Sequence, residues 1–233
     1  MDDGGPRANT SGTLYVVATP IGNLEDLTFR ALRILGEVAA IACEDTRQTL
    51  KLLNKYNLKK TLISYYQPRE GQKIPYILSL LDQGKDIALV SDSGTPGISD
   101  PGFRLIREAL RAGIKIVPIP GPTALAAGLS AAGLPTHRFL FVGFPPPKRA
   151  AQKKLLASLK NESATLVFYI PGRKIVEFLG QTLETFGDRR VVVAREITKF
   201  YEEFLRGNAS DVLALAEKKK LRGELTLLIH GAD

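Results

Sequence analysis

The chain has 233 residues, of which 44% are apolar and 24% charged, and only one is a cysteine. This balance is typical of a soluble globular protein, excludes an intrachain disulfide, and leaves no apolar run long enough to cross a bilayer. The formal net charge of +8 favours an anionic partner without identifying it. Residues 1–12 lack the apolar centre of a secretory signal, so we expect a flexible tail there and a cytoplasmic protein.

Short apolar stretches alternate with helical patterns through the first half of the chain. The stretches of strand length are 14–18, 38–43, 61–64, 87–90 and 114–117. The segments between them predict helices over 29–36, 46–56, 74–83 and 103–112. This alternation is typical of βαβ units and predicts a mostly parallel sheet covered by helices.

The pattern changes after the proline-rich segment 118–122. A helix of small residues is expected over 123–132, and strands are expected near 139–142, 165–169, 191–194, 199–205 and 225–230. These later strands are spaced less regularly, which indicates a partly antiparallel sheet. We therefore predict an α/β fold with two domains, 13–122 with a mostly parallel sheet and 123–233 with a mixed sheet.

A polar loop rich in glycine and proline, 91–102, follows the expected buried strand 87–90. Glycines let the backbone approach a ligand closely, prolines fix its path, and the Asp, Ser and Thr side chains supply polar groups. Ligands of open α/β sheets bind at such strand ends. A plain strand-to-helix turn, with Asp100 as N-cap and Pro101 in the first helical turn, would explain those two residues but not 91–97.

Two other expected strands end in polar loops. Glu44, Asp45, Thr46 and Arg47 follow the second strand, and the segment 19–26 follows the first. A helix N-cap accounts for Asp45 but leaves Glu44 and Arg47 unexplained. Because the carboxyl ends of parallel strands meet at one edge of a sheet, we expect these loops and 91–102 to form one ligand site.

The sequence lacks the motifs of several common ligand-binding sites. It contains neither a phosphate-binding P-loop nor the glycine fingerprint of dinucleotide-binding folds. Two separated histidines and one cysteine do not make a zinc cluster of the usual spacing, so we expect no metal. Basic clusters at 148–160 and at Lys218–Lys220 with Arg222 suit either a solvated surface or contact with RNA phosphates.

Five segments together resemble a known family. They are 12–26, 43–47, 91–102, 120–124 and 194–199. These motifs are similar to those of the small-subunit ribosomal RNA methyltransferases, which belong to the tetrapyrrole-methylase-like class that uses S-adenosylmethionine. The resemblance implies two α/β domains with the cofactor in the cleft between them, a homodimer, and methylation of a cytidine ribose 2′-hydroxyl in the decoding region of 16S ribosomal RNA.

The resemblance also implies residues around the cofactor. In the first domain and at the domain boundary these are Pro20, Ile21, Asp92, Ser93, Gly94, Thr95, Pro96, Thr123 and Ala124. In the second domain they are Phe144, Tyr169, Ala194, Glu196 and Thr226. The chain departs from the family pattern at 65–70 and at 169–173, where relatives carry histidines.

Methyl transfer to a ribose hydroxyl requires in-line placement of the oxygen and exclusion of water, and a base assists it. Glu44, Asp45 and Glu70 are candidate bases, and Arg47 is a candidate partner for an alkoxide or phosphate. A cytidine in folded RNA must be turned out of its surroundings, and Tyr65, Tyr66 and Phe144 are candidates for stacking on it.

Two other functions remain open at this stage. The chain could methylate a tetrapyrrole carbon, although its first loop lacks the G-x-G-x-G-D run expected of that branch. It could also be a non-catalytic RNA-binding protein, as the basic clusters alone would permit.

Overall fold

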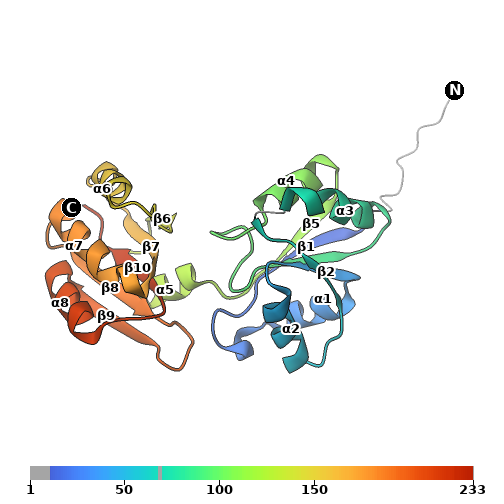
Figure 1. The fold of residues 1–233 in the computed structure, drawn as a ribbon, viewed down its shortest axis with the longest axis horizontal. Helices are drawn as coiled ribbons and strands as arrows, with labels where there is room; N and C mark the ends of the chain where they lie inside the picture. Colours follow the sequence, from blue (N-terminus) through green and yellow to red (C-terminus); the bar gives the residue numbers. More distant parts are fainter. Residues whose placement is uncertain (1–10, 68–69, 233) are drawn as a thin grey trace. The chain divides into compact units, whose positions relative to one another are not determined.

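The computed structural model describes residues 11–67 and 70–232, which divide into two compact units, the first ending at Thr123 and the second beginning at Ala124 (Figure 1). The expected tail 1–12 lies outside the described residues except at 11 and 12. Gly12 is not part of a flexible tail, because its N–H donates to the Leu81 carbonyl at 2.7 Å. A Cβ there would lie 2.2 Å from the Lys85 carbonyl oxygen, so only glycine fits.

The first unit contains a parallel sheet with the order β3-β2-β4-β1-β5. Its strands are β1 (Thr13–Val17), β2 (Ala40–Cys43), β3 (Thr61–Ser64), β4 (Ile87–Val90) and β5 (Lys115–Ile119). Each lies within about two residues of the strand expected from its apolar run. The prediction of a parallel sheet in this half of the chain is therefore confirmed.

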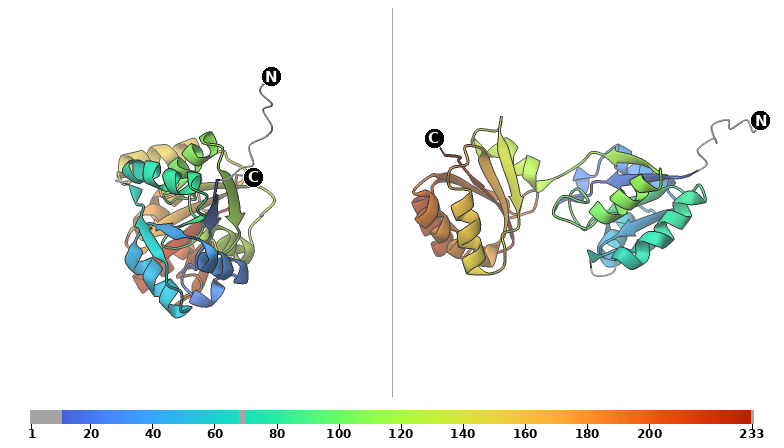
Figure 2. Two further views of the ribbon diagram at one scale, coloured as in Figure 1. Left: turned by 90° about the vertical axis from the view of Figure 1, so that its right-hand side faces the viewer. Right: turned by 90° about the horizontal axis from the view of Figure 1, so that it is seen from above.

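Helices cover both faces of this sheet (Figures 1 and 2). On one face lie α1 (Phe29–Glu37) and α2 (Thr46–Lys55), and on the other lie α3 (Glu70–Asp82) and α4 (Phe103–Arg111). Strand β4 shows why: Ile87 and Leu89 pack toward α3 and α4, while Ala88 and Val90 pack toward α1 and α2. Burial on both faces explains the unbroken apolar runs in the sequence.

The strand order creates a topological switch point between β1 and β4. The chain leaves β1 through α1 on one face and leaves β4 through α4 on the opposite face. The connections that follow these adjacent strands therefore lead from the carboxyl edge of the sheet to its opposite faces. Ligands of doubly wound folds bind at this place.

The second unit contains a mixed sheet with the order β6-β7-β10-β8-β9, in which β6 and β7 are parallel and the other pairs antiparallel. Its strands are β6 (Phe139–Gly143), β7 (Thr165–Pro171), β8 (Arg190–Arg195), β9 (Glu203–Asn208) and β10 (Glu224–Ile229). The prediction of a mixed sheet is confirmed, but the strand expected at 199–205 begins only at Glu203. The preceding residues form a tight connection, with Thr198 in the left-handed region at φ 68°.

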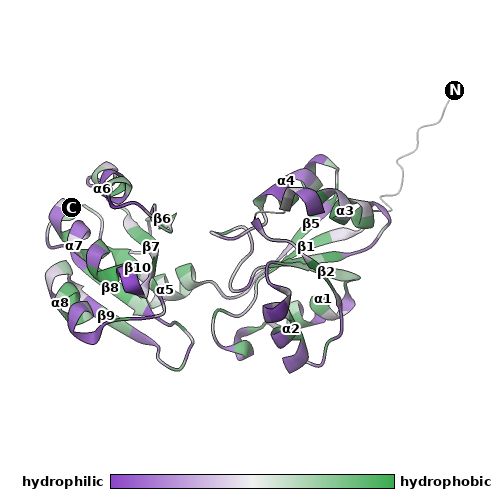
Figure 3. Ribbon diagram, viewed as in Figure 1, coloured by the Kyte–Doolittle hydropathy of each residue, from purple (hydrophilic) through white to green (hydrophobic). Residues whose placement is uncertain are grey.

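Helices α6 (Arg149–Ser158), α7 (Ile175–Phe186) and α8 (Ala209–Lys219) pack on one face of this sheet, and α5 (Ala124–Ala132) packs on the other. A short 3₁₀ turn, Gly172–Lys174, precedes α7. Helix α5 approaches β10 closely, since a Cβ on Gly128 would lie 3.2 Å from Thr226 Cγ2. Figure 3 shows the apolar strands inside each unit and the polar outer helix faces. In the part of the chain that the structure describes, no helix is both long and apolar enough to cross a membrane.

Candidate functional site

The loops that follow β1 and β4 are joined at the switch point. Thr19 and Gly94 form an antiparallel bridge, with Thr19 N–H donating to Gly94 O at 2.9 Å and Gly94 N–H donating to Thr19 O at 3.0 Å. The Thr19 hydroxyl also donates to the Ser91 carbonyl at 3.1 Å. These bonds satisfy buried backbone groups and fix the two loops as one surface.

The loop after β4 needs its glycines. Gly94 and Gly97 have φ of 82° and 81°, a region that residues with a Cβ rarely adopt. The Thr95 hydroxyl donates to the Pro122 carbonyl at 3.4 Å, which connects this loop to the loop after β5. The close approach continues at Gly121, where a Cβ would lie 2.9 Å from the Ala18 side chain. Three strand ends are thereby brought together.

The interpretation of Asp100 as a helix N-cap is wrong. Helix α4 begins at Phe103 and its N-cap is Gly102, and no side chain of the described residues caps it. Asp100 instead turns inward, where burial raises the pKa of its carboxyl group to about 6. A hydrogen bond with Ser91 opposes this rise, and the Asp92 carboxylate adds to it.

The loop after β2 contributes Asp45 as the N-cap of α2. Its carboxylate accepts from the Arg47 N–H at 2.8 Å and from Arg47 Nη2 at 2.6 Å. The hydrogen bonds from Arg47 lower the pKa of Asp45 to about 2. The Asp45 N–H donates to Asp92 Oδ1 at 2.9 Å, so this loop is tied to the loop after β4. The expected convergence of polar loops is present in the structure.

Carboxylates gather at this edge. Burial raises the pKa of Glu44, and the charges of Asp92, Asp100 and Asp45 add to the rise. Partial desolvation also raises the pKa of Asp92; the hydrogen bond from the Asp45 N–H opposes this rise and the Asp45 charge adds to it. Arg47 lies within reach of these groups, but it is paired with Asp45. The carboxylates raise one another's pKa values, so the edge has a negative potential that favours a cationic ligand.

The candidate bases differ in quality. Asp45 is the poorest proton acceptor, because Arg47 holds its carboxylate in the ionised form. Glu44 and Asp100 have raised pKa values and suit proton transfer better. Helix α3 begins at Glu70, but the side chain of Glu70 lies outside the described part of the structure. Among the residues that the structure describes, no group of three or more His, Cys, Asp and Glu side chains is placed to hold a metal ion.

The expected cofactor residues of the first unit lie on these loops. Pro20 and Ile21 follow the bridge at Thr19, and Ile21 Cγ2 lies 3.6 Å from the position of a Cβ on Gly94. The segment Asp92 to Pro96 is the loop after β4 itself. Asp92 and Ser93 are exposed, and Pro96 is buried. Thr123 ends the unit.

The expected cofactor residues of the second unit also come together, on the face of its sheet that carries α5. Tyr169 pairs with Thr226, and Thr226 pairs with Ala194, in adjacent strands. The Tyr169 hydroxyl accepts from the Leu125 N–H at 3.1 Å, in the first turn of the helix that begins at Ala124. The Phe144 ring contacts the Tyr169 ring edge-on, with centroids 5.5 Å apart.

Glu196 has a structural task in this unit. Its carboxylate accepts from the Glu224 N–H at 2.8 Å and from Lys199 Nζ at 3.1 Å. Burial opposes ionisation, but these hydrogen bonds lower the pKa of Glu196. The group that the resemblance assigns to the cofactor is thus used to hold the connection between β8 and β9.

The prediction that Tyr65 stacks on a base of the RNA is wrong. Its side chain is 1% exposed, and its hydroxyl accepts from the Leu105 N–H in α4 at 3.3 Å. Phe144 is exposed, as a stacking residue must be. Sequence reasoning missed the bridging role of Thr19, and it assigned Asp100 to a cap because an Asp-Pro pair before a helix is the usual signal of one.

Comparison with known proteins adds to this geometry. A family model described as tetrapyrrole (corrin/porphyrin) methylases matches residues 13–213. The chain is 46% identical over 222 residues to the ribosomal RNA small subunit methyltransferase I of Thermotoga maritima, covering 95% of this chain and 100% of that protein. It is 43% identical to the Bacillus subtilis protein of the same name, covering 95% of this chain and 76% of that one.

Solved structures share the fold. The methyltransferase CobJ superimposes with a TM-score of 0.72 at 21% identity, covering 95% of both chains. A cobalt precorrin-4 methyltransferase superimposes with a TM-score of 0.68 at 17% identity, covering 94% of both chains.

Proposed function

Because this chain belongs to the tetrapyrrole methylase family, we propose that it transfers a methyl group from S-adenosylmethionine to the 2′-hydroxyl of a cytidine ribose in the decoding region of 16S ribosomal RNA. That the chain is a methyltransferase follows from the family, and this excludes the non-catalytic alternative. The nucleotide and the atom that receive the methyl group are the proposed part.

The observation that carries the proposal is the carboxylate-lined edge at the switch point between β1 and β4. S-adenosylmethionine carries a sulfonium and an ammonium group, and the negative potential of Glu44, Asp92 and Asp100 complements them. Gly94 and Gly97 let the backbone of the loop approach the ligand. These residues fit the cofactor, and we propose that they hold it together with Pro20, Ile21 and Thr95.

We propose a second set of cofactor contacts in the other unit, from Phe144, Tyr169, Ala194, Thr226 and Ala124. Phe144, Tyr169, Ala194 and Thr226 are linked through one face of the sheet, and Ala124 begins the helix whose first turn bonds to Tyr169. Glu196, also expected at the cofactor, differs from these five because its carboxylate is already bonded to Lys199 and Glu224. We propose that only its backbone is free to take part.

Methyl transfer to a ribose requires a correctly positioned hydroxyl group and a proton acceptor. The bound cofactor supplies an electrophilic methyl group on a sulfonium. Transfer would form a carbon–oxygen bond at the ribose oxygen as the carbon–sulfur bond breaks, and the protein would accept the hydroxyl proton. We propose Glu44 or Asp100 as the acceptor, since their raised pKa values suit this task better than that of Asp45. Arg47, with 85% of its side chain exposed, remains a candidate for a phosphate of the RNA.

The relatives favour RNA over a tetrapyrrole as substrate. Proteins named for ribosomal RNA methylation are 43% and 46% identical to this chain over nearly its full length. The precorrin enzyme is 17% identical and supports the fold alone. With this substrate goes a cytoplasmic location, and the homodimer expected from the resemblance belongs to the same proposal.

The test is transfer of labelled methyl to small ribosomal subunits from a strain that lacks the corresponding enzyme, with the product mapped by mass spectrometry. We expect label on the ribose of a cytidine in the decoding region. Label on a base, or on another nucleotide, would contradict the proposed target while leaving methyl transfer intact. Label on a precorrin and none on RNA would contradict the proposal altogether.

A further inference from the structure

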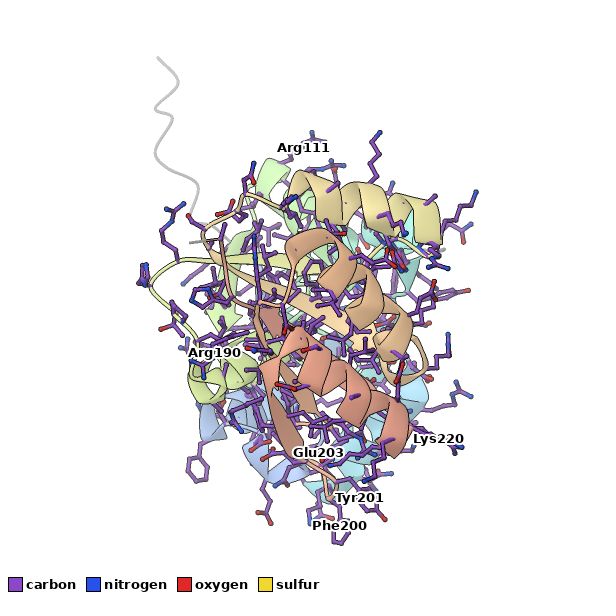
Figure 4. The ribbon with its side chains drawn as sticks, turned by 90° about the vertical axis from the view of Figure 1, so that its left-hand side faces the viewer. Arg111, Arg190, Phe200, Tyr201, Glu203 and Lys220 are labelled. Atoms are coloured by element: carbon purple, nitrogen blue, oxygen red, sulfur yellow. The ribbon has the colours of Figure 1, made fainter. Side chains whose placement is uncertain are left out.

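The connection between β8 and β9 presents exposed aromatic side chains. Phe200 is 92% exposed and Tyr201 is 66% exposed. Their rings contact each other edge-on, with centroids 5.0 Å apart and planes at 89°. Figure 4 shows both residues at the end of the connection, pointing away from the sheet. Aromatic rings in this position leave apolar area in water, so their exposure needs an explanation.

The backbone beneath these rings is firmly held. Glu196 and Thr198 adopt left-handed φ values of 48° and 68°, which are unfavourable for residues with a side chain. Lys199 Nζ bonds to Glu196 Oε1 at 3.1 Å and to Glu224 Oε2 at 2.9 Å. The Thr198 N–H donates to Glu202 Oε2 at 2.6 Å. The tip, residues 196–202, is therefore ordered before it meets a partner, which lowers the entropic cost of binding.

The sheet edge that carries the tip is basic. The ends of β6, β7 and β8 and the starts of β9 and β10 lie at this edge. The second unit, 124–233, has 17 Lys and Arg against 11 Asp and Glu, so it carries +6 of the formal charge of +8. Both basic clusters of the sequence contribute residues here, at the start of α6 and at the end of α8.

Three acids at this edge are already neutralised, whereas Glu202 in the tip forms no ion pair among the described residues and accepts the Thr198 N–H. Glu203 pairs with Arg195 and Lys219, and Glu196 and Glu224 pair with Lys199. Among the residues that the structure describes, several cations near this edge form no ion pair. These are Lys148, Arg173, Lys174, Lys218, Lys220 and Arg222. Unpaired cations and exposed rings at one sheet edge suit single-stranded RNA, since rings stack on bases and cations neutralise phosphates.

We propose that the tip binds a single-stranded segment of the RNA substrate, with Phe200 and Tyr201 stacking on unpaired bases and Lys218, Lys220 and Arg222 contacting phosphates. This inference rests on the proposed function, because it takes RNA as the substrate. It adds a binding surface that is separate from the carboxylate edge of the first unit. Stacking needs no particular base, so the tip contributes affinity and register, not recognition of the cytidine.

The experiment compares wild-type protein with F200A, Y201A and the double variant. Binding is measured with a short fluorescein-labelled single-stranded RNA and with unmethylated small ribosomal subunits. We expect about tenfold weaker RNA binding for each single variant and about 100-fold for the double variant. The affinity for S-adenosylmethionine should stay the same, because Phe200 and Tyr201 are not among the proposed cofactor contacts. Exchanging the rings as F200Y and Y201F should retain binding.

Y76A is the matched control, since Tyr76 is 52% exposed on α3 of the first unit. A second arm, K218Q with K220Q, should reduce the slope of log affinity against log salt by about 0.7 for each phosphate that the protein no longer neutralises. Both arms use the full chain, and Phe200 is so exposed that its removal leaves packing intact.

The outcomes separate this inference from the proposed function. If wild-type protein methylates ribosomal subunits and the double variant binds RNA equally well, the inference is overturned and the proposed function stands. If wild-type protein neither binds nor methylates RNA, both are overturned. A double variant that dissociates from dimer to monomer with unchanged RNA affinity would show that a second copy of the chain, and not RNA, covers the tip.

Discussion

Asp100 offers the sharpest test of the site, because its burial has a calculable cost. Its pKa is raised from 3.8 to about 6 in the folded protein. The difference is about 2 pH units, at about 1.4 kcal/mol each, which gives a ceiling of about 3 kcal/mol. Since the carboxyl group is partly exposed, screening by water reduces the expected effect to about 1 kcal/mol.

The sign follows from the direction of the shift. A carboxyl group whose folded pKa is raised favours folding while it is protonated, and this contribution is lost as the pH rises through about 6. D100N should therefore be about 1 kcal/mol more stable than wild-type protein at pH 7.5. The two should converge near pH 3, below the ordinary pKa of 3.8. The substitution keeps the shape of the side chain and its contact with Ser91.

The assay is urea unfolding of both proteins across this pH range, with the Asp100 carboxyl titrated separately by NMR. D82N, at an exposed carboxylate at the end of α3, serves as the control and should change stability equally little at both pH values. If D100N proves less stable than wild-type protein at pH 7.5, the site stabilises the ionised carboxylate and the reasoning fails. A gain in stability accompanied by a loss of methyl transfer would mark Asp100 as a residue retained for function.

Three further outcomes are expected. D45N should reduce the kcat of methyl transfer by less than tenfold, whereas loss of the true proton acceptor should reduce it by about 100-fold or more. A loss of about 100-fold in D45N would show that Asp45 is the proton acceptor. G94A should bind S-adenosylmethionine more weakly, as measured by calorimetry. The φ of 82° strains an alanine, although the space around its Cβ is adequate, with Ile21 Cγ2 at 3.6 Å. Unchanged affinity would mean that cofactor binding does not depend on the loop geometry. Y169F should lower the stability of the second unit by about 1 kcal/mol, since the Leu125 N–H loses its acceptor, and an unchanged melting temperature would contradict this.

Periodicity predicted the strands because burial on both faces leaves a strong signal in the sequence. The runs at 87–90 and 61–64 coincide with β4 and β3. The strand expected at 199–205 was misplaced because the aromatic residues Phe200 and Tyr201 suggest a strand, although here they lie exposed on a turn. Local propensity cannot distinguish a buried ring from one presented to a partner.

The candidate site also has features that the sequence predicts and features that it does not. Convergence of the polar loops was predictable, because the carboxyl ends of parallel strands share one edge. The inward turn of Asp100 was not, since it depends on Gly102 adopting φ of 143° and serving as the cap in its place. The pairing of Asp45 with Arg47, which removes Asp45 as the best base, likewise needed coordinates.

The distribution of charge between the two units explains why the net charge of +8 does not identify where an anionic partner binds. The first unit, in which the carboxylate edge lies, is nearly neutral, with 15 Lys and Arg against 13 Asp and Glu. Carboxylates that attract a sulfonium repel phosphates, so the RNA backbone gains little from this edge. A substrate hydroxyl can reach it only if another surface supplies the affinity that holds the RNA. The exposed rings of the tip and the unpaired cations at the same sheet edge would meet that requirement, and the salt dependence of RNA binding should therefore follow Lys218, Lys220 and Arg222 more than Arg47, which is paired with Asp45.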